Sequence, residues 1–341
     1  MNQVRLAPVD TVTITTLVDN VIDVFMPGQH NVTRFTDGSS PEQRSASTLA
    51  GGEVAEHPRT EHGFSALIEV HTADRKSVLL FDAGRTPDGL AHNIKVLGVD
   101  PTGIEAIVLS HGHFDHTTGL DGFTRRLGTA NLPVVIHPNF WSRRRVTFPG
   151  REPWELPSTS KSALEAVGFD ILEHRQPSFL LHDSVLVTGE IDRTNSFELG
   201  FPLQEAHDGS GWRPDPLVLD DQAIVIHVRD LGLVVMTGCG HAGVVNTVTY
   251  AQRLTSVEKV HAIIGGFHLN GPIFEPLIPK ICEAFAGWAP GVIMPAHCTG
   301  WRATHQLAAS FPEAFVHNSV GSRLHLGSPA AAPLAPPPFP T

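Results

Sequence analysis

Four side chains of the metal-binding type fall within six positions of this chain: His111, His113, Asp115 and His116, in the segment SHGHFDH. They follow the short apolar run IEAIVL, residues 104–109, which predicts a buried strand. We expect an extended turn to aim His111 and His113 at one metal ion, and Asp115 and His116 to face a second ion close by. Imidazole nitrogen and carboxylate oxygen suit Zn2+, and also iron or manganese. A loop that is histidine-rich by chance is the alternative, and this density of ligand-type residues directly after a strand disfavours it.

Apolar periodicity elsewhere predicts an alternation of strands and helices in two β-rich halves. β-Branched and apolar runs predict strands over Thr11–Val18 and over residues 64–70, 78–81, 223–228, 231–236, 260–264 and 292–294. Helical spacing predicts helices over residues 88–97, 244–254 and 277–287. The polar stretch 28–59 is interpreted as a long loop. This order favours a layered α/β sandwich.

The middle of the chain, residues 139–157, interrupts this pattern. Trp141 and Trp154 are mixed with Arg143, Arg144 and Arg145, and neither a helical nor a strand period is visible. We interpret this segment as an insertion or lid over a pocket, within one domain of residues 1–327. The last residues, 328–341, are SPAAAPLAPPPFPT, and we expect them to be disordered because a Pro/Ala segment cannot form a core.

Arg143 and Arg144 are the candidates for binding substrate, because a guanidinium pairs two donors with a phosphate or a carboxylate. The neighbouring Trp141 and Trp154 could stack on a flat ring. This interpretation favours an anionic aromatic substrate such as a pterin derivative. The alternative is a solvated surface loop with no contact to substrate.

The composition limits the partners of the protein. A formal net charge of -11 argues against nucleic acid or an anionic membrane surface as the main partner. No window approaches the roughly 18 apolar residues of a membrane helix, and the first residues lack the basic start and apolar core of a secretory signal. Three cysteines do not suit a disulfide framework. We expect a cytoplasmic protein that acts on a small molecule, and a homo-oligomer is compatible with the sequence.

Residues 111–116 match the HxHxDH motif of the metallo-β-lactamase superfamily, and LLFDAG at residues 79–84 is similar to the Asp-bearing turn of that superfamily. Further segments resemble one branch, often labelled dihydropteroate-synthase-like or 7,8-dihydropterin-6-methyl-4-(β-D-ribofuranosyl)aminobenzene-5'-phosphate synthase. These segments are EHGFS (61–65), TGEI (188–191), GCGHAG (238–243), GGFHL (265–269) and PAHCTG (295–300). The resemblance implies an α/β fold of the αββα type, in which two mixed sheets pack face to face, helices cover the outside and the metal site lies at one edge.

The resemblance also implies the ligands of two divalent metal ions, which we expect to be Zn2+. It assigns five ligands: His111 and His113 to the first ion, and Asp115, His116 and His297 to the second. The sequence departs from the superfamily at a bridging aspartate, because the strand before it ends in Gly238-Cys239. We take His241, two residues further on, to complete the ligands of the first ion. Cys239 either binds metal as a thiolate or packs as a small buried residue.

From this site we expect a binuclear metal-dependent hydrolase, in which a metal-bound hydroxide attacks an ester, phosphoester, lactone or amide. Asp115 would accept a proton from the attacking water, and His268 would protonate the leaving group; packing is the alternative for His268. Glu190 and His62 either orient a ligand histidine or are ordinary turn residues. The alternative functions are a dihydropterin condensation, a metal-dependent ligand-binding or sensor module without turnover, and a redox role with iron.

Overall fold

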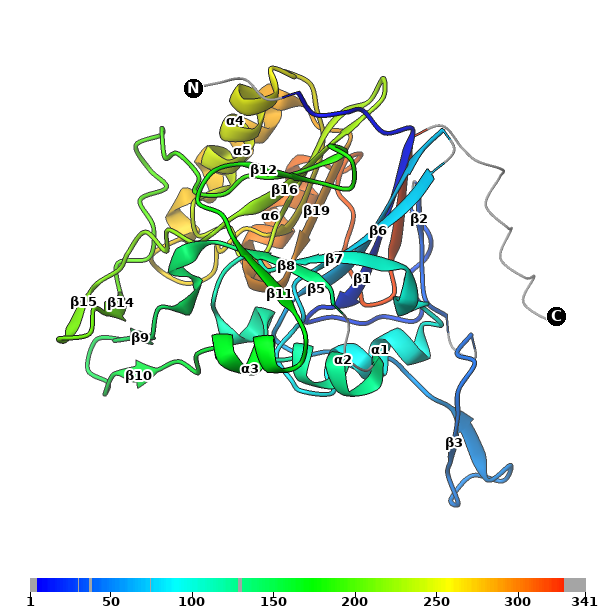
Figure 1. The fold of residues 1–341 in the computed structure, drawn as a ribbon. Coiled ribbons are helices and arrows are strands. Elements are labelled where there is room, and N and C mark those ends of the chain that lie inside the picture. The colour runs from blue at the N-terminus through cyan, green and yellow to red at the C-terminus, as the bar shows by residue number, and fades with distance from the viewer. Residues whose placement is uncertain (1–4, 30, 37–38, 74, 128–130, 328–341) are drawn as a thin grey trace.

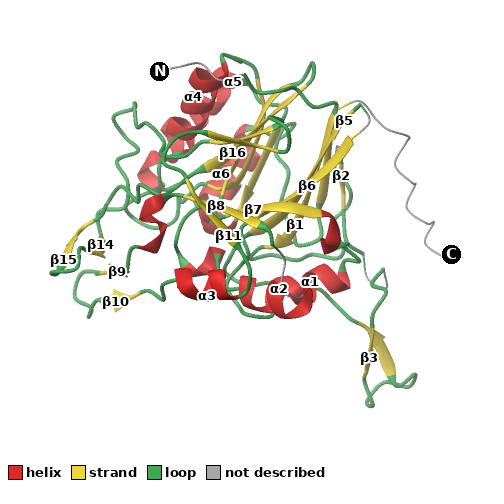
Figure 2. Ribbon diagram, in the orientation of Figure 1, coloured by secondary structure: helices red, strands yellow, loops and turns green. Residues whose placement is uncertain are grey.

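A computed structural model describes residues 5–29, 31–36, 39–73, 75–127 and 131–327. Two mixed β-sheets pack face to face, and helices cover the outer face of each sheet (Figures 1 and 2). The expected αββα sandwich is therefore confirmed. The expectation of a disordered tail concerns residues 328–341, which lie outside the described residues.

The first sheet has eight strands in the order β11-β8-β7-β6-β5-β1-β20-β2. Their bounds are β1 Thr11–Val18, β2 Val32–Thr33, β5 Ser65–Thr72, β6 Arg75–Phe81, β7 Ile104–Val108, β8 Pro133–Ile136, β11 Asp170–Glu173 and β20 Arg323–Gly327. Neighbouring strands from β6 to β11 are parallel, so their carboxyl ends meet at one edge of the sheet.

The second sheet has six strands in the order β12-β13-β16-β17-β18-β19. Their bounds are β12 Ser178–Leu180, β13 Val185–Val187, β16 Ala223–Val228, β17 Gly232–Thr237, β18 Val260–Gly266 and β19 Val292–Ala296. Strands β17, β18 and β19 are parallel. Their carboxyl ends therefore also lie together, and they bring the segments GCGHAG, GGFHL and PAHCTG to one edge.

Helices form the two outer layers. Figure 2 shows α1 (Gly89–Val96), α2 (Leu120–Leu127) and α3 (Lys161–Ala166) on one side of the molecule, and α4 (Val244–Thr255), α5 (Ile278–Trp288) and α6 (Trp301–Ser310) on the other. Three apolar clusters correspond to this layering: one between the sheets, with Phe81 and Met236, and one under each helical layer, with Leu90 and Phe285 as members. Burial of these side chains at about 25 cal/mol per Å2 is the main stabilising contribution.

The sequence pattern predicts β1 over the same residues, and it predicts β5, β6, β7, β16, β17, β18, β19, α1, α4 and α5 within three residues of their bounds. It leaves the remaining strands and helices of the two sheets and outer layers unpredicted: β2, β8, β11, β12, β13, β20, α2, α3 and α6. It also misses the strands of the segment 139–157. There β9 (Arg144–Val146) and β10 (Trp154–Glu155) join β14 (Gln204–His207) and β15 (Trp212–Pro214) in a small separate sheet. The partner β14 lies about sixty residues away along the chain, so no local period indicates the pairing.

The long loop expected over residues 28–59 also contains short strands. β3 (Gln43–Ser45) and β4 (Glu53–Ala55) pair as a hairpin that projects from the body of the molecule (Figure 1).

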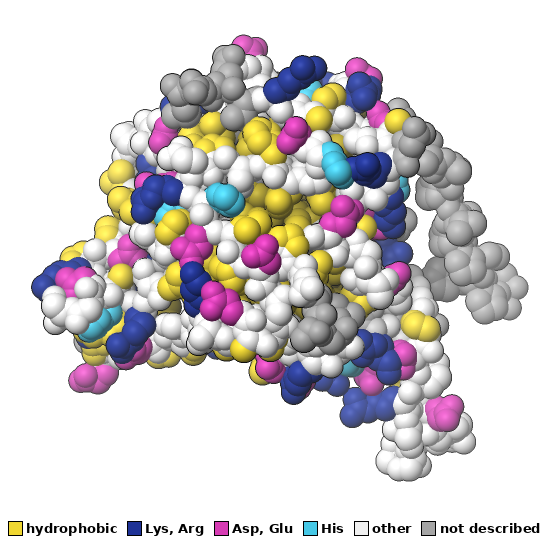
Figure 3. Space-filling model, in the orientation of Figure 1, with side chains coloured by type: hydrophobic (Ala, Val, Ile, Leu, Met, Phe, Trp, Pro, Cys, Tyr) yellow, Lys and Arg dark blue, Asp and Glu magenta, His cyan; other side chains and the backbone are white. Residues whose placement is uncertain are grey.

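The surface carries charges of both signs. On the face drawn in Figure 3, basic and acidic side chains are interspersed, and hydrophobic side chains are visible in the middle of the face, over the seam between the two sheets. Among the described residues, no helix combines the length and the hydropathy that a membrane crossing requires.

Candidate metal centre

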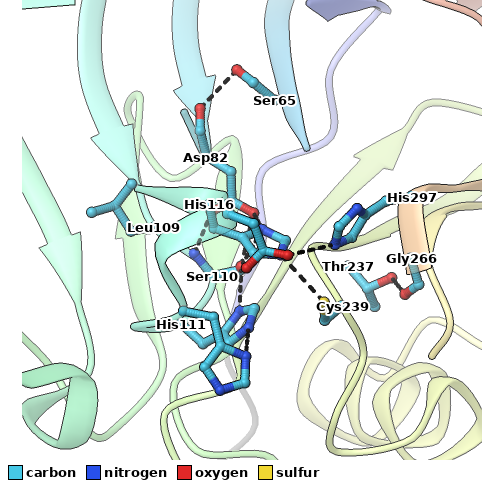
Figure 4. Close-up of polar contacts among 12 residues, drawn as sticks. Ser65, Asp82, Leu109, Ser110, His111, His116, Thr237, Cys239, Gly266 and His297 are labelled. Carbon is cyan, nitrogen blue, oxygen red and sulfur yellow. Dashed lines mark hydrogen bonds and ion pairs between the residues drawn. The ribbon is translucent and has the colours of Figure 1, made fainter. Parts of the chain in front are cut away.

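The segments that carry the predicted ligands meet at one edge of the sandwich. His111, His113 and His116 follow β7 of the first sheet, whereas His241 and His297 follow β17 and β19 of the second. Figure 4 shows that His111 and His116 on one side, and Cys239 and His297 on the other, point toward one another. The close approach of the two sheets requires Gly238, because a Cβ there would lie 2.1 Å from Ser110 Oγ.

The first group of ligand atoms contains His111, His113 and His241, whose nearest ring nitrogens all lie within 4.8 Å of one another. His111 Nε2 lies 2.9 Å from His113 Nδ1. Nδ1 of His111 is 2.9 Å from Ser110 Oγ, which fixes the ring with its Nε2 toward the group. All three imidazoles are buried. This is the predicted first set, and its geometry suits one metal ion.

The second group adjoins the first and contains Asp115, His116, His297 and Cys239. Asp115 Oδ2 lies 3.5 Å from His297 Nε2, and His116 Nε2 lies 3.2 Å from Cys239 Sγ. His62 is a further neighbour, because its Nε2 is 3.9 Å from Asp115 Oδ2. The Cys239 thiol also lies within 4.8 Å of ligand atoms of the first group, so it stands where the two groups meet.

Asp82, at the end of β6, supports both groups from behind. Its carboxylate is fully buried and accepts hydrogen bonds from the Ser110 N–H at 2.7 Å and the Ser110 hydroxyl at 2.8 Å. It also lies 2.6 Å from His116 Nδ1. A carboxylate on one ring nitrogen leaves the other nitrogen, here Nε2, free to bind a metal ion. The Asp-bearing turn LLFDAG therefore orients a predicted ligand.

Two further aspartates fix the turns that carry the ligands. Asp19, at the end of β1, accepts the His297 N–H at 2.8 Å, and His297 has a left-handed φ of 48°. Asp220 accepts the N–H of Gly112, between His111 and His113, at 2.8 Å. The first bond stabilises a backbone conformation of His297 that is otherwise unfavourable for a residue with a side chain, and the second holds the backbone between two predicted ligands.

Burial and neighbouring charges shift the pKa values of the site in opposite directions. Burial, with the charge of neighbouring histidines, holds the pKa values of His111 and His241 well below the ordinary range. Burial, together with the Arg144 charge, lowers the pKa of His113 to about 4. Burial opposes the charged form of His116 as well, but the carboxylates of Asp82 and Asp115 outweigh it and raise the pKa of His116 to about 9.

The residues present fit divalent metal ions. Neither ring nitrogen of His241 or of His297 has a hydrogen-bond partner, although both rings are buried. Unpaired buried nitrogens are unfavourable unless another group satisfies them. Neutral imidazoles and a carboxylate are the ligand forms that Zn2+ and similar ions bind. The donor set therefore suits metal ions at both groups.

A cavity of about 930 Å3 adjoins both groups. Its lining includes His113, Asp115, His241, His268 and His297. Much of the rest of the lining is apolar, with side chains such as Phe114, Val146, Phe148, Trp154, Phe201 and Phe274. The segment 139–157 thus contributes side chains to the cavity, through β9, β10 and the turn between them.

The predicted proton donor His268 lines this cavity. Its Nδ1 has no hydrogen-bond partner, and its ring centroid lies 4.4 Å from that of His241 and 4.8 Å from that of Phe274. A left-handed φ of 46° orients its backbone. The structure therefore brings His268 to the site, next to a predicted ligand.

The structure does not support Arg143 and Arg144 as groups that bind substrate, because neither lines the cavity. Arg144 is buried, with its side chain 2% exposed; it forms an ion pair with Asp220 and donates to Asp215 Oδ2 at 3.0 Å. Arg143 pairs with Glu155 outside the cavity, at 2.5 Å. Asp215 and Asp220 lie about seventy residues from Arg144 along the chain, and Glu155 lies across a hairpin from Arg143. The run of arginines alone therefore did not indicate these ion pairs.

Glu190 does not orient a predicted ligand histidine, which was one of the two roles considered for it. Its carboxylate lies 3.3 Å from Nε2 of His137 and 2.6 Å from Nη1 of Arg175, and not beside a predicted ligand. His62, by contrast, lies in the site, with its ring centroid 4.7 Å from that of His297.

Asp19, Asp220 and Arg85 are site residues that the sequence reasoning missed. Asp19 stands in LVDN at the end of a predicted strand, and Asp220 in the pair Asp220-Asp221 just before another. The position of each aspartate, directly after or just before a predicted strand, was the only signal in the sequence that could have indicated a role at the site. Arg85 follows the LLFDAG turn and had no pattern of its own.

Comparisons with known proteins agree with this fold. Residues 59–254 match the model of the metallo-beta-lactamase superfamily. A relative from Methanocaldococcus jannaschii, 7,8-dihydropterin-6-methyl-4-(beta-D-ribofuranosyl)-aminobenzene-5'-phosphate synthase, is 31% identical over 276 residues, which cover 79% of this chain and 89% of the relative. An uncharacterized protein of the same organism is 29% identical over 265 residues, 76% of this chain and 92% of that protein.

A solved structure has the same fold. Tm1679, a metal-dependent hydrolase of the beta-lactamase superfamily, is similar over 93% of this chain and 100% of its own, with a TM-score of 0.69 and 21% sequence identity. Fold and site thus define an αββα protein with a histidine-rich centre at one edge of its two sheets. This chain belongs to the metallo-β-lactamase superfamily. The identity with the synthase also confirms the expected resemblance to that branch.

Proposed function

We propose that this chain is a binuclear metal-dependent hydrolase that acts on a small molecule bound in the cavity. The observation that carries the proposal is the pair of adjoining ligand groups, one around His111 and His113 and the other around Asp115 and His297, beside a cavity of about 930 Å3. A cavity of this volume suits a small organic molecule. The candidate bonds are those of an ester, a phosphoester, a lactone or an amide.

In this proposal, His111, His113 and His241 hold one ion, and Asp115, His116 and His297 hold the other. Two bound divalent ions would lower the pKa of water toward neutrality and polarise the substrate oxygen. Asp115 would accept a proton, since its carboxylate faces the cavity. His268 would donate a proton to the leaving group, because its ring lines the same cavity. Cys239 lies where the two groups meet. It is the candidate to bind metal at the position where other members of the superfamily have the bridging aspartate.

A second candidate function is a condensation that joins a dihydropterin to an aromatic partner. The observation that favours it is the 31% identity with a relative whose name is that of a synthase. To compare the two functions, the metal-loaded protein would be given 4-(β-D-ribofuranosyl)aminobenzene-5'-phosphate and a 7,8-dihydropterin that carries a leaving group, such as diphosphate, on its 6-methylene carbon. The amine would then form the C–N bond as the leaving group departs and the amine loses a proton. Formation of the coupled product, with no hydrolysis of any ester, phosphodiester or lactone, would replace our first proposal with the second.

Metal analysis of the purified protein, paired with a screen of ester, phosphodiester and lactone substrates, tests the proposal. We expect close to two ions per chain and turnover of at least one substrate class. His111→Ala and Asp115→Ala should lose bound metal and turnover while they keep a cooperative unfolding transition. The exposed His174 gives the matched control, and His174→Ala should keep both properties.

Metal-free protein that shows no turnover after addition of zinc, manganese or iron would contradict the proposal and favour a ligand-binding module. Metal content is measured independently of activity, so loss of a ligand and loss of a substrate contact give different results.

A further inference from the structure

Arg85 is the only lysine or arginine among the described residues that line the cavity. Within the described ranges, no carboxylate lies within ion-pair distance of its guanidinium: its one carboxylate contact is made by its backbone N–H, which donates to Glu61 Oε1 at 2.6 Å. Arg85 is half-buried, and a cation that is partly removed from water is stabilised by a counter-charge. Arg85 therefore has an unused capacity to bind an anion.

The guanidinium of Arg85 lies over an aromatic ring of the cavity. Its Cζ lies 4.6 Å from the centroid of the Phe114 ring, a cation–π contact. Phe114 in turn packs edge to face on Trp154, with centroids 6.2 Å apart. Since Phe114 directly precedes Asp115, this stack lies beside the second ligand group. An anion bound by Arg85 would therefore lie at the end of the cavity that carries the candidate chemistry.

The carboxylates in the cavity lining are committed to other partners. Asp19 accepts hydrogen bonds from the backbone of Asn20 and His297 and from the Asn318 side chain. Asp115 faces His297 and His62. Arg85 therefore acts on the site as an uncompensated positive charge.

The rest of the cavity favours an apolar body on the same molecule. Half of the large apolar side chains that are exposed in the described part of the chain line this cavity: Val21, Phe148, Trp154, Ile273 and Trp301. Exposed apolar side chains gathered at one place mark a binding surface. Flat side chains such as Trp154 and Phe148 suit an aromatic ring.

We propose that Arg85 binds the carboxylate or phosphate of an anionic aromatic substrate, whose apolar body lies against the aromatic side chains of the cavity. This inference rests on the proposed function, because it assumes that the cavity is the substrate site. A guanidinium forms paired hydrogen bonds with either anion, and it recognises both by the same planar donors.

Equilibrium binding to the metal-containing protein tests the inference without any turnover. The probes are 2-naphthoate, 2-naphthyl phosphate and the neutral 2-naphthalenemethanol. Arg85→Gln should raise the Kd of at least one anion by roughly 10- to 100-fold, the usual effect of losing hydrogen bonds to a charged group, and leave the neutral probe unchanged. Direct binding of an anion to the metals contributes equally to both proteins and cancels in this comparison. The anion with the larger loss identifies the substrate's charged group.

Two further variants control for charge and shape. Arg126→Gln removes the same charge from the exposed part of α2, outside the cavity, and should change no Kd. Arg85→Lys keeps the charge but not the planar donors, so it should retain part of the preference for anions. Equal losses for all three probes in Arg85→Gln, no loss for either anion, or no binding of either anion to the unmodified protein would overturn the inference. A charge-selective loss in a protein without hydrolytic turnover would instead uphold it and reject the hydrolase.

Discussion

At the scale of single residues, Asp82 shows how a side chain that binds no metal can determine a metal site. Its carboxylate accepts two hydrogen bonds from Ser110 and holds Nδ1 of His116, and it does so from a left-handed φ of 56°. Aspartate tolerates this backbone conformation better than most residues do. The nearest contact that orients His116 therefore comes from one buried carboxylate.

Replacement of Asp82 by asparagine should weaken metal binding without unfolding the protein. The amide keeps the size of the side chain but carries no charge, so it stabilises the bound form of His116 less well. Loss of such a supporting carboxylate usually lowers metal affinity by roughly 10- to 100-fold. Competition with a chelator of known affinity measures the change. An unchanged affinity, with the protein still folded, would mean that Asp82 only shapes the turn.

At the scale of elements, helix α4 begins directly after the turn that carries His241, and its first residues are capped from elsewhere. Gly243, before the helix, has no side chain to act as a cap. Glu198 supplies the acceptors instead: Oε1 accepts the Val245 N–H at 2.9 Å and Oε2 accepts the Asn246 N–H at 2.8 Å. A carboxylate at this end also interacts favourably with the helix dipole.

Glu198→Ala should lower the free energy of unfolding by about 1–3 kcal/mol, because two buried N–H groups lose their acceptors. Burial raises the pKa of Glu198 in the folded protein. The folded state therefore binds a proton more tightly than the unfolded state does, and this contribution to stability is fully present below the ordinary pKa of 4.5. It is lost as the pH rises through the raised pKa.

Denaturant unfolding at several pH values checks both parts of this prediction. The difference between the unmodified protein and Glu198→Ala should be larger near pH 5 than near pH 8. Glu165→Ala, on the exposed face of α3, serves as the matched control and should show a small difference that does not vary with pH. A difference that grows with pH for Glu198 would contradict the assignment.

At the scale of the whole molecule, Arg144 ties the small sheet to the metal centre. It extends from β9 to Asp220, and Asp220 also holds the backbone of Gly112 between two predicted ligands. Both members of this ion pair are buried. The segment 139–157 is therefore connected to the site in two ways: through the buried pair of Arg144 with Asp220, and through the side chains that it contributes to the cavity wall.

Arg144→Met should lower the free energy of unfolding by about 3–5 kcal/mol, because it leaves the Asp220 carboxylate buried without its partner. Arg143→Met, one residue away, should change it by less than about 1 kcal/mol, since the pair with Glu155 is exposed. The two unfolding curves in denaturant give the comparison. Similar small losses in both variants would show that the Arg144 pair contributes little to stability.

The sequence by itself determined the layers of this protein and the residue types at its centre. Periodicity of two and of 3.6 residues is a local property, so β1, the hairpin β16–β17 and helix α4 could be predicted from short windows. The histidine motif after β7 is local as well. The segments around His241 and His297 could be assigned through resemblance because their motifs are short and contiguous.

Only the tertiary structure decided which side chains meet. The β9–β14 pairing, the burial of Arg144 against Asp220 and the anchoring of His297 by Asp19 all join residues that lie far apart along the chain. Arginine in a polar stretch has the same local pattern whether it binds substrate or a buried carboxylate. Its role depends on which charges lie within a few ångströms after folding. For Arg85 that surrounding is a cavity in which, among the described residues, no carboxylate lies within ion-pair distance of the guanidinium.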